Sequence, residues 1–383
     1  MRVRLRPRHP GDGDRHGAPG GHRRRRVRRH RLRRGHRAGP ARNPAAQRRR
    51  TGHPADPDRP GRRLPQAQPK PIGGPVPGSR IPERLVTASE AVSVIPDGAT
   101  VAIGGHTLRR HPMALVREII RQRKRDLHLL GWNNGIDMDM LVGAGCARAV
   151  ETSYVGMGPL GLARNLRRHV ESGRVRTVDH SETTAIDMFR ATALGVDFLP
   201  NRTPLGTDLM TYNDGLVEIT SPFTGQTYAA VRGVEPDFVI LHAHCADVHG
   251  NVQLDEANWG DNTVDPFIGR AGKHVIVSVE EVVSTDHIRA NPRRTFLPRE
   301  YVTAVVHAPF GAHPCCCDAR YGYDQAELRR YQEAAGTAEG FEDYLADRVT
   351  SVADHWAYLD RVGVAGLLTA ATAPSTIQGA DAA

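Results

Sequence analysis

Residues 99–121 read ATVAIGGHTLRRHPMALVREIIR, and this stretch predicts how the body of the chain folds. Its first five residues are small or apolar and fit a buried strand, which ends at Gly104 and Gly105. Pro112 suits the start of a helix, and apolar residues follow it at helical spacing through Arg121. The stretch therefore predicts a strand, a glycine turn and a helix.

The same unit recurs along the chain. Further strands are expected at 127–130, 147–155, 175–178, 198–200, 238–241, 275–279 and 302–306, and helices at 87–95, 138–142, 162–170, 184–194 and within 325–358. Strands that alternate with helices of this length pair in parallel through right-handed crossovers. The predicted fold class is therefore α/β, with an open, mainly parallel sheet and helices on both faces.

One segment departs from this alternation. The runs 217–220 and 227–231 are joined by a turn that contains Gly225, and they predict a β-hairpin inserted at an edge of the sheet.

The formal net charge of +10 divides unevenly along the chain. Residues 1–80 hold 23 Arg and one Lys against four Asp, which is 24 − 4 = +20, so residues 81–383 carry 10 − 20 = −10. The first segment has too few apolar residues to offset the entropy cost of ordering it. We therefore expect three parts: an Arg/Pro/Gly-rich disordered leader (1–80), one α/β domain (81–362) and a small-residue tail (363–383).

The leader has two interpretations. Its arginines could bind phosphates, which would make the chain a nucleic-acid-associated protein. Alternatively it is an inert extension, because arginine without glutamate and almost without lysine is typical of out-of-frame translation of a GC-rich region. The acidic body makes a nucleic-acid partner the weaker prediction.

The cellular compartment is inferred from two kinds of apolar segment and from the spacing of the cysteines. We find no apolar run of the roughly 18 residues that a membrane helix needs, and no apolar core of a secretory signal in the leader. The five cysteines lack the spacing of a disulfide framework. We expect a cytoplasmic protein without a membrane partner.

The most ligand-like cluster is His242, His244, Cys245 and His249. In isolation this spacing invites zinc. However, residues 242 and 244 would share one side of a strand while 245 takes the other, and the residues that follow are typical of a turn. We therefore predict no metal site.

The three cysteines at 315–317 are a second candidate site. A nucleophilic cysteine needs a base, and His313 is close in sequence. A bend whose direction is set by Pro314 is the favoured interpretation.

In a parallel sheet, ligands bind beyond the carboxyl ends of the strands. The residues that follow the expected strands are Gly104-Gly105, 132–134, 179–182, 205–208 and 242–251. The glycine turn predicts free N–H groups that could hold an anion or an oxyanion. Glu182 could be a nucleophile or base, although its Ser/Thr-rich surroundings equally suit a helix cap.

Several short strings occur in a fixed order along the chain. They are Gly104-Gly105, 110–118, 139–145, 151–156, 198–200, 205–209, 246–247, 250–253 and 311–314, with Tyr321 and Asp324. In this order they resemble the alpha subunit of family I CoA-transferases, above all the glutaconate CoA-transferase branch. The resemblance runs from about residue 82 to residue 360.

The resemblance implies an alpha subunit that moves CoA between an acyl-CoA thioester and a carboxylic acid, with a separate beta subunit in a heterodimer or an α2β2 assembly. It implies that a glutamate attacks the thioester to give an acyl anhydride. CoA thiolate then attacks that anhydride to leave a glutamyl thioester, and the acceptor acid takes over the CoA. The main nucleophilic glutamate is expected in the beta subunit. The resemblance also implies that coenzyme A is a substrate, and it implies no permanently bound cofactor.

The resemblance also leaves an alternative. A related branch hydrolyses ring-cleavage CoA thioesters in steroid-type catabolism, and its catalytic glutamate matches the stretch around Glu182. The residues expected to bind CoA or substrate are Gly104, Gly105, Arg109, Arg110, Gly206, Thr207, Asp208, Asp247, Gly250 and Asn251.

Overall fold

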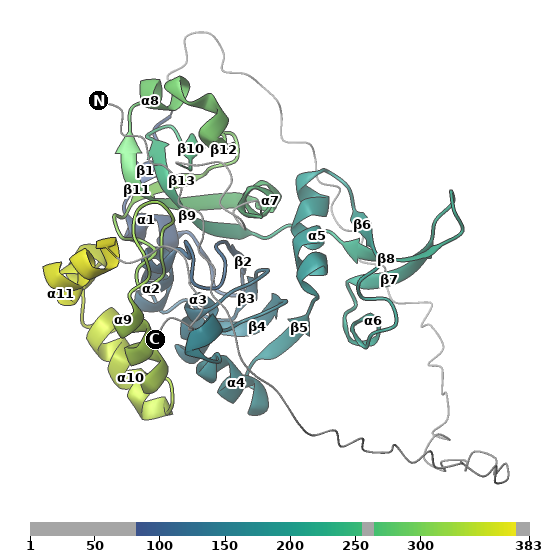
Figure 1. The fold of residues 1–383 in the computed structure, drawn as a ribbon, viewed down its shortest axis with the longest axis horizontal. Coiled ribbons are helices and arrows are strands. Elements are labelled where there is room, and N and C mark those ends of the chain that lie inside the picture. The colour runs from purple at the N-terminus through teal and green to yellow at the C-terminus, as the bar shows by residue number, and fades with distance from the viewer. Residues whose placement is uncertain (1–81, 255–263, 373–383) are drawn as a thin grey trace, which may run out of the picture. The chain divides into compact units, whose positions relative to one another are not determined.

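The structure is a computed structural model that describes residues 82–254 and 264–372 (Figure 1). The predicted leader lies outside the described residues, as does the predicted tail beyond residue 372. The first residues of that tail belong to the last helix, α11 (His355–Thr372), which is interrupted at Gly363, where φ is +79°. The division of the chain into three parts stays a prediction. Within the described ranges, no helix combines the length and apolarity needed to cross a lipid bilayer.

A parallel sheet forms the centre of the described chain. Its strands in spatial order are β1 (Leu85–Val86), β13 (Ala304–His307), β11 (His274–Val283), β9 (Phe238–Asp247), β2 (Thr100–Ile103), β3 (Leu127–Leu130), β4 (Ala147–Thr152) and β5 (Arg176–Asp179). All neighbours along this path pair in parallel. The short strands β10 (Val252–Gln253) and β12 (Thr295–Leu297) pair antiparallel beside β9. The predicted α/β class is confirmed.

Helices cover both faces of this sheet (Figure 1). The helices of the described residues are, besides α11, α1 (Ala88–Ser93), α2 (Met113–Arg121), α3 (Ile136–Gly143), α4 (Arg164–Glu171), α5 (Glu182–Ala193), α6 (Leu209–Tyr212), α7 (Asp265–Ala271), α8 (Thr285–Ala290), α9 (Gln325–Ala334) and α10 (Ala338–Leu345). Alternate side chains of β2 belong to two different hydrophobic cores. Val101 and Ile103 pack with α2 and α3, whereas Ala102 packs with α5 and α7.

A capping box fixes the start of α1. Thr87 caps α1, because its hydroxyl accepts the N–H of Glu90 at 3.1 Å while the Glu90 carboxylate accepts the N–H of Thr87 at 2.9 Å. This reciprocal pair satisfies two N–H groups that a helix start leaves open. The helix predicted at 87–95 is confirmed.

A second, smaller sheet lies beside α5 (Figure 1). Its order is β6 (Phe198–Asn201), β8 (Thr227–Arg232) and β7 (Leu216–Thr220), all antiparallel. The predicted hairpin is confirmed, but its predicted place at an edge of the main sheet is wrong. The expectation that 198–200 continues the parallel sheet is also wrong. The Phe198 side chain is 45% exposed, whereas a parallel strand is buried on both faces.

Strand β9 is longer than predicted. The apolar run suggested residues 238–241, yet the strand continues to Asp247 and all ten of its residues are buried. The apolar run does not reach residues 242–247, because the burial of polar side chains such as His242 and His244 depends on hydrogen-bond partners from distant segments. Beyond Ile240, the partner of Ile103, strand β9 runs past the end of β2.

Candidate active site

The strand order places a switch point between β2 and β9. From β2 the sheet extends through β3 and β4 to β5, and from β9 it extends through β11 to β13. The helices that follow β2 and precede β11, α2 and α7, belong to different cores and therefore to opposite faces. Ligands of open α/β sheets bind where the connections diverge in this way. The glycine turn after β2 lies at this point.

Asp265, the first residue of α7, holds the glycine turn. Its Oδ1 accepts the backbone N–H of Gly105 at 2.9 Å, and its Oδ2 lies 2.8 Å from Nη2 of Arg110. The N–H of Gly104 donates to the carbonyl of Ile240 at 3.1 Å. The expectation of free N–H groups on the two glycines is therefore wrong, because both groups are used to fix the turn itself.

The close approach of this turn to its neighbours explains the two glycines. A Cβ on Gly104 would lie 2.2 Å from Cδ2 of Leu241 and 2.8 Å from Oδ1 of Asp265. Gly105 has a φ of +95°, and a Cβ there would lie 2.6 Å from the carbonyl oxygen of Arg109. Neither position has room for a side chain.

The two arginines of the turn have different environments. The Arg110 side chain is almost fully buried between Asp265 and Asp318, whose Oδ2 lies 3.9 Å from its Nε. Arg109 pairs with Oδ1 of Asp318 at 3.3 Å, and its side chain keeps 21% exposure. Arg110 therefore fixes the turn, and Arg109 is the one of the two that reaches the surface. Their role in binding CoA stays a prediction.

A row of polar groups lines the surface at the switch point. His106 stacks on Trp132 with 4.9 Å between ring centroids, and its Nε2 accepts a hydrogen bond from Nδ2 of Asn133 at 3.0 Å. The Thr107 hydroxyl donates to Oδ1 of Asn133 at 3.2 Å. His106, Thr107 and Asn133 are half-buried, so they offer donors and acceptors to a ligand while their positions are fixed.

Glu182 lies in the first turn of α5 and is exposed. Ser181 is the N-cap, since its hydroxyl accepts the N–H of Thr184 at 3.3 Å. The hydroxyl groups of Ser181 and Thr183 lie 3.0 and 2.7 Å from that of Thr203. The cap interpretation is thus confirmed for Ser181, which leaves the carboxylate of Glu182 at the surface.

The predicted ligand residues 206–208 follow Thr203 closely in the chain and therefore belong to the neighbourhood of Glu182. The Thr207 hydroxyl donates to the carbonyl of Pro204 at 2.7 Å, and Asp208 directly precedes α6. The structure thus groups these residues with Glu182 near the carboxyl end of β5, apart from the glycine turn at β2.

A carboxylate that sequence analysis missed lies behind this group. Glu151 on β4 accepts from Nε2 of His180 at 3.1 Å, and Nε2 of His128 lies 3.1 Å from its other oxygen. Burial alone would raise the pKa of Glu151, but hydrogen bonds from the two histidines outweigh it and lower the pKa to about 2. The three residues come from β3, β4 and the end of β5, so no local spacing signals the cluster.

The predicted residues Asp247, Gly250 and Asn251 form the tight turn between β9 and β10. Oδ1 of Asp247 accepts the N–H groups of His249 and Asn251 at 3.1 and 2.9 Å. Gly250 has a φ of +94°. The turn chemistry expected from the sequence is confirmed, and a ligand role for these residues stays a prediction.

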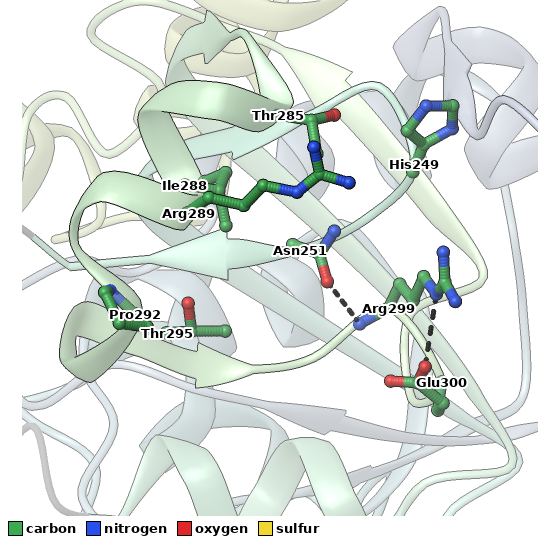
Figure 2. A pocket seen from close by; sticks show the side chains of 9 residues that line it. All are labelled: His249, Asn251, Thr285, Ile288, Arg289, Pro292, Thr295, Arg299 and Glu300. Carbon is green, nitrogen blue, oxygen red and sulfur yellow. Dashed lines mark hydrogen bonds and ion pairs between the residues drawn. The ribbon is translucent and has the colours of Figure 1, made fainter. Parts of the chain in front are cut away.

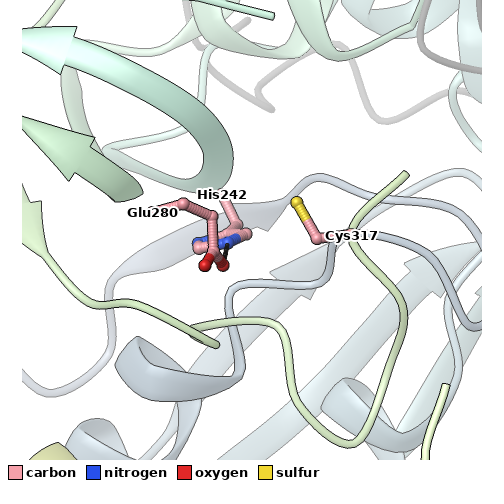
Figure 3. Close-up of side chains that lie close together, drawn as sticks. All are labelled: His242, Glu280 and Cys317. Atoms are coloured by element: carbon pink, nitrogen blue, oxygen red, sulfur yellow. Dashed lines mark hydrogen bonds and ion pairs between the residues drawn. The ribbon is translucent and has the colours of Figure 1, made fainter. Parts of the chain in front are cut away.

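Figure 3 shows His242, Glu280 and Cys317, whose potential ligand atoms lie within 4.8 Å of one another. The Glu280 carboxylate already accepts from Nε2 of His242 at 2.6 Å, the Tyr321 hydroxyl at 2.7 Å and the N–H of Phe310 at 2.7 Å. These hydrogen bonds give the buried carboxylate partners without an ion. His242 and Glu280 therefore belong to a structural hydrogen-bond network.

The zinc-like cluster seen in the sequence does not converge on one point. Nε2 of His242 donates to Glu280, whereas Nε2 of His244 donates to the carbonyl of Asp318 at 2.6 Å. Of the four residues of that cluster, the close grouping above contains only His242.

The cysteines at 315–317 are buried. Burial raises the pKa of Cys316 to about 12 and raises the pKa values of Cys315 and Cys317 well above that of an ordinary thiol. A thiol with a raised pKa is a poor nucleophile at neutral pH. The interpretation of this run as a bend, not a reactive centre, fits its structure.

Comparisons with known proteins show which family the chain resembles. A profile described as Coenzyme A transferase matches residues 85–308. The chain is 33% identical over 309 residues to the A subunit of glutaconate CoA-transferase from Acidaminococcus fermentans, covering 76% of this chain and 95% of its relative. The crystal structure of that enzyme superposes with a TM-score of 0.72 over 76% of this chain and 96% of the other, at 32% identity.

Three other relatives are also similar to this chain. The A subunit of 3-oxoadipate CoA-transferase from Pseudomonas knackmussii is 36% identical, over 70% of this chain and 95% of its own length. A cholesterol ring-cleaving hydrolase IpdA subunit of Rhodococcus jostii is 29% identical, over 72% and 94%. An uncharacterized protein of Archaeoglobus fulgidus is 37% identical, but the match covers 62% of its length and 73% of this chain. From the matched profile, the shared subunit length and the shared fold, the chain belongs to the coenzyme A transferase family.

Proposed function

We propose that this chain is the A subunit of a CoA-transferase, which moves CoA between an acyl-CoA thioester and a carboxylic acid. One observation carries the proposal: the match to the A subunit of glutaconate CoA-transferase spans 95% of that relative. The similarity therefore concerns one whole subunit of a two-subunit enzyme. We propose that its partner is a separate beta subunit, in a heterodimer or an α2β2 assembly, and that coenzyme A is a substrate.

In this proposal the nucleophilic glutamate belongs to the partner. Its carboxylate attacks the thioester carbonyl and expels CoA thiolate, which leaves an acyl anhydride. The thiolate then attacks the glutamyl carbonyl of the anhydride, releases the first acid as a carboxylate and leaves a glutamyl-CoA thioester. The acceptor carboxylate repeats these steps in reverse order, so each bond that breaks is replaced by one that forms.

The described residues of this chain suit a supporting role. The turn held by Asp265 sits at the switch point, and His106, Thr107 and Asn133 present fixed polar groups beside it. Such groups can orient a bound acyl-CoA against the partner's nucleophile. Arg109, Gly206, Thr207 and Asp208 remain proposed contacts for CoA or substrate.

A hydrolase that acts on a CoA thioester is the second candidate. Two observations favour it: the IpdA-type relative matches over 94% of its length, and the Glu182 carboxylate is exposed at the start of α5. The transferase relatives are more similar, at 33% and 36% identity against 29%. The hydrolase is therefore the less supported of the two.

The test is to produce the full chain together with the product of the neighbouring gene and to follow CoA transfer from an acyl-CoA to a panel of carboxylic acids. Transfer that needs both chains supports the proposal. Release of free CoA without an acceptor acid would instead identify a hydrolase. The cytoplasmic location expected from the sequence stays a prediction.

A further inference from the structure

A cavity of about 330 Å³ lies beyond the carboxyl ends of β9 and β11 (Figure 2). Its lining comes from the turn after β9, from α8 and from the segment that leads through β12 to Glu300. It is lined by His249, Asn251, Thr285, Ile288, Arg289, Pro292, Thr295, Arg299 and Glu300. This volume reaches the lower end of the range typical of small-molecule sites.

A buried carboxylate fixes the walls of the cavity. Oδ2 of Asp247 accepts from Nδ2 of Asn251 at 2.8 Å and from the Thr285 hydroxyl at 3.0 Å. Oδ1 of Asn251 in turn accepts the backbone N–H of Arg299 at 3.3 Å. Asp247 is fully buried at the end of β9. The turn, the start of α8 and the segment at Arg299 are thereby tied together.

The charged groups that line the cavity are mainly basic. Figure 2 shows the Arg289 guanidinium turned toward His249 and Asn251, with Arg299 on the other side of Asn251. Arg289 pairs with Asp286 at 3.3 Å, but the two side chains are 75% and 88% exposed. Nε of Arg299 pairs with Glu300, which is 64% exposed, at 3.1 Å. The exposed Arg289–Asp286 pair contributes little stability, so an entering anion can replace it. The Arg299 side chain is 22% exposed, but its partner Glu300 is exposed and can give way to an anion.

The surroundings strengthen this basic character. Residues 284–300 contain four Arg against Asp286 and Glu300, which is 4 − 2 = +2, in a body whose net charge is −10. Arg84 adds another guanidinium next to the cavity, donating to the carbonyls of Arg299 and Val302. Burial lowers the pKa of Arg84; the charge of Glu300 opposes this effect and the charge of Arg299 adds to it. Cations are thus crowded here within an otherwise acidic body.

We propose that this cavity binds the phosphate group of a phosphorylated ligand, with Arg289 and Arg299 as its cationic contacts and His249 at its rim. The planar guanidinium group donates two parallel N–H bonds and matches the oxygens of a phosphate. Two such groups and an imidazole offer more donors than a single carboxylate can use, whereas a phosphate monoester has three strong acceptor oxygens.

Coenzyme A is the ligand that the proposed function would bring here, and to that extent the inference rests on it. The end of β9 lies seven residues beyond Ile240, the partner of Ile103 at the end of β2. At the usual rise of a strand this is a separation of about 20 Å from the glycine turn. The pantetheine arm of CoA likewise separates its phosphates from its thioester, so one molecule can engage both places.

The experiment is calorimetric titration of the full-length chain with CoA, with 3′-dephospho-CoA and with inorganic phosphate. Arg289→Ala and Arg299→Ala are compared with Arg167→Ala, which removes another surface arginine from its pair with Glu171 on α4. We expect Arg299→Ala to weaken the binding of CoA about tenfold, Arg289→Ala about threefold because it is more exposed, and Arg167→Ala not at all.

The probes distinguish the sources of the phosphate. If the two substitutions weaken CoA and the effect is smaller for 3′-dephospho-CoA, the cavity takes the 3′-phosphate of CoA. If they weaken inorganic phosphate alone, the phosphate site stands and CoA is not its source. If neither substitution changes the binding of any probe that the unaltered chain binds, or if the unaltered chain binds none of them, the inference is wrong.

The outcome is separable from that of the proposed function. CoA transfer by the two-chain enzyme together with unchanged binding in both variants would refute the proposed phosphate site and leave the proposed function standing. Weakened phosphate binding in the variants of a chain that transfers no CoA would refute the proposed function alone.

Discussion

The carboxylate of Asp265 accepts the backbone N–H of Gly105 at 2.9 Å, although 160 residues separate them in the chain. The same carboxylate pairs with the buried Arg110, so one side chain at the start of α7 fixes the turn at the switch point. A turn fixed in this way keeps its shape before a ligand arrives, which is what precise orientation of a substrate requires.

The first prediction concerns this ion pair. Asp265→Asn can keep the hydrogen bond to Gly105 but leaves the Arg110 guanidinium buried beside one fewer carboxylate. Removing one partner of a buried pair costs about 3 kcal/mol. Urea unfolding followed by circular dichroism should show that loss, and Asp286→Asn, at an exposed pair, should lose less than about 1 kcal/mol. Equal losses in the two variants would mean that the buried pair does not stabilise the turn.

The second prediction concerns acid. The folded-state pKa of Glu151 lies near 2, below the ordinary value of 4.5 expected when the chain unfolds, so its ionised form stabilises the fold. That stabilisation is complete above about pH 5 and is lost as the pH falls toward 2. The free energy of unfolding should therefore be about 2 to 3 kcal/mol lower for Glu151→Gln than for the unaltered chain at pH 7.

This difference should shrink between pH 5 and pH 3. Urea unfolding of both chains across that interval measures it. A difference that stays constant with pH would contradict the assignment of a low pKa to Glu151.

The third prediction concerns the thiols. Because burial raises the pKa values of Cys315, Cys316 and Cys317, iodoacetamide at pH 8 should leave them unmodified in the folded chain and modify them in denaturant. Mass spectrometry of tryptic peptides gives the extent of alkylation. Rapid alkylation of Cys316 in the folded chain would revive the reactive-centre interpretation.

The sequence predicted the alternating elements well, because each rests on local spacing. The predictions fail where contacts between residues far apart in the sequence determine the structure. The predicted buried strand ends at residue 241, yet His242 is also buried, through its bond to Glu280, 38 residues away. The sequence predicts free N–H groups at the glycine turn because nothing near Gly105 in sequence identifies Asp265 as an acceptor.

The same limit applies to the small sheet and to the cavity. Residues 198–200 have the composition of a strand, but composition does not choose between the parallel sheet and an antiparallel partner such as β8. Arg289 and Arg299 are ordinary charged residues in the sequence, and only the turn tied by Asp247 brings them to one cavity. For the start of α7, the sequence offers one weak signal, which is the Asp-Pro pair at Asp265.

The fourth prediction separates the two candidate functions. Glu182→Ala, assayed with the partner chain, should abolish a hydrolase and leave a transferase measurably active. The exposed position of Glu182 makes a folding defect a small concern, and thermal unfolding of the variant checks it. Unchanged activity would remove Glu182 from any catalytic role.

In the proposed function, this chain is one subunit of a CoA-transferase whose nucleophile belongs to its partner. Mass spectrometry of the two-chain complex, quenched during turnover with an acyl-CoA, tests this claim most directly. We predict a CoA thioester on a glutamate of the partner and none on this chain. CoA transfer without an adduct on the partner, or an adduct at Glu182, would contradict it.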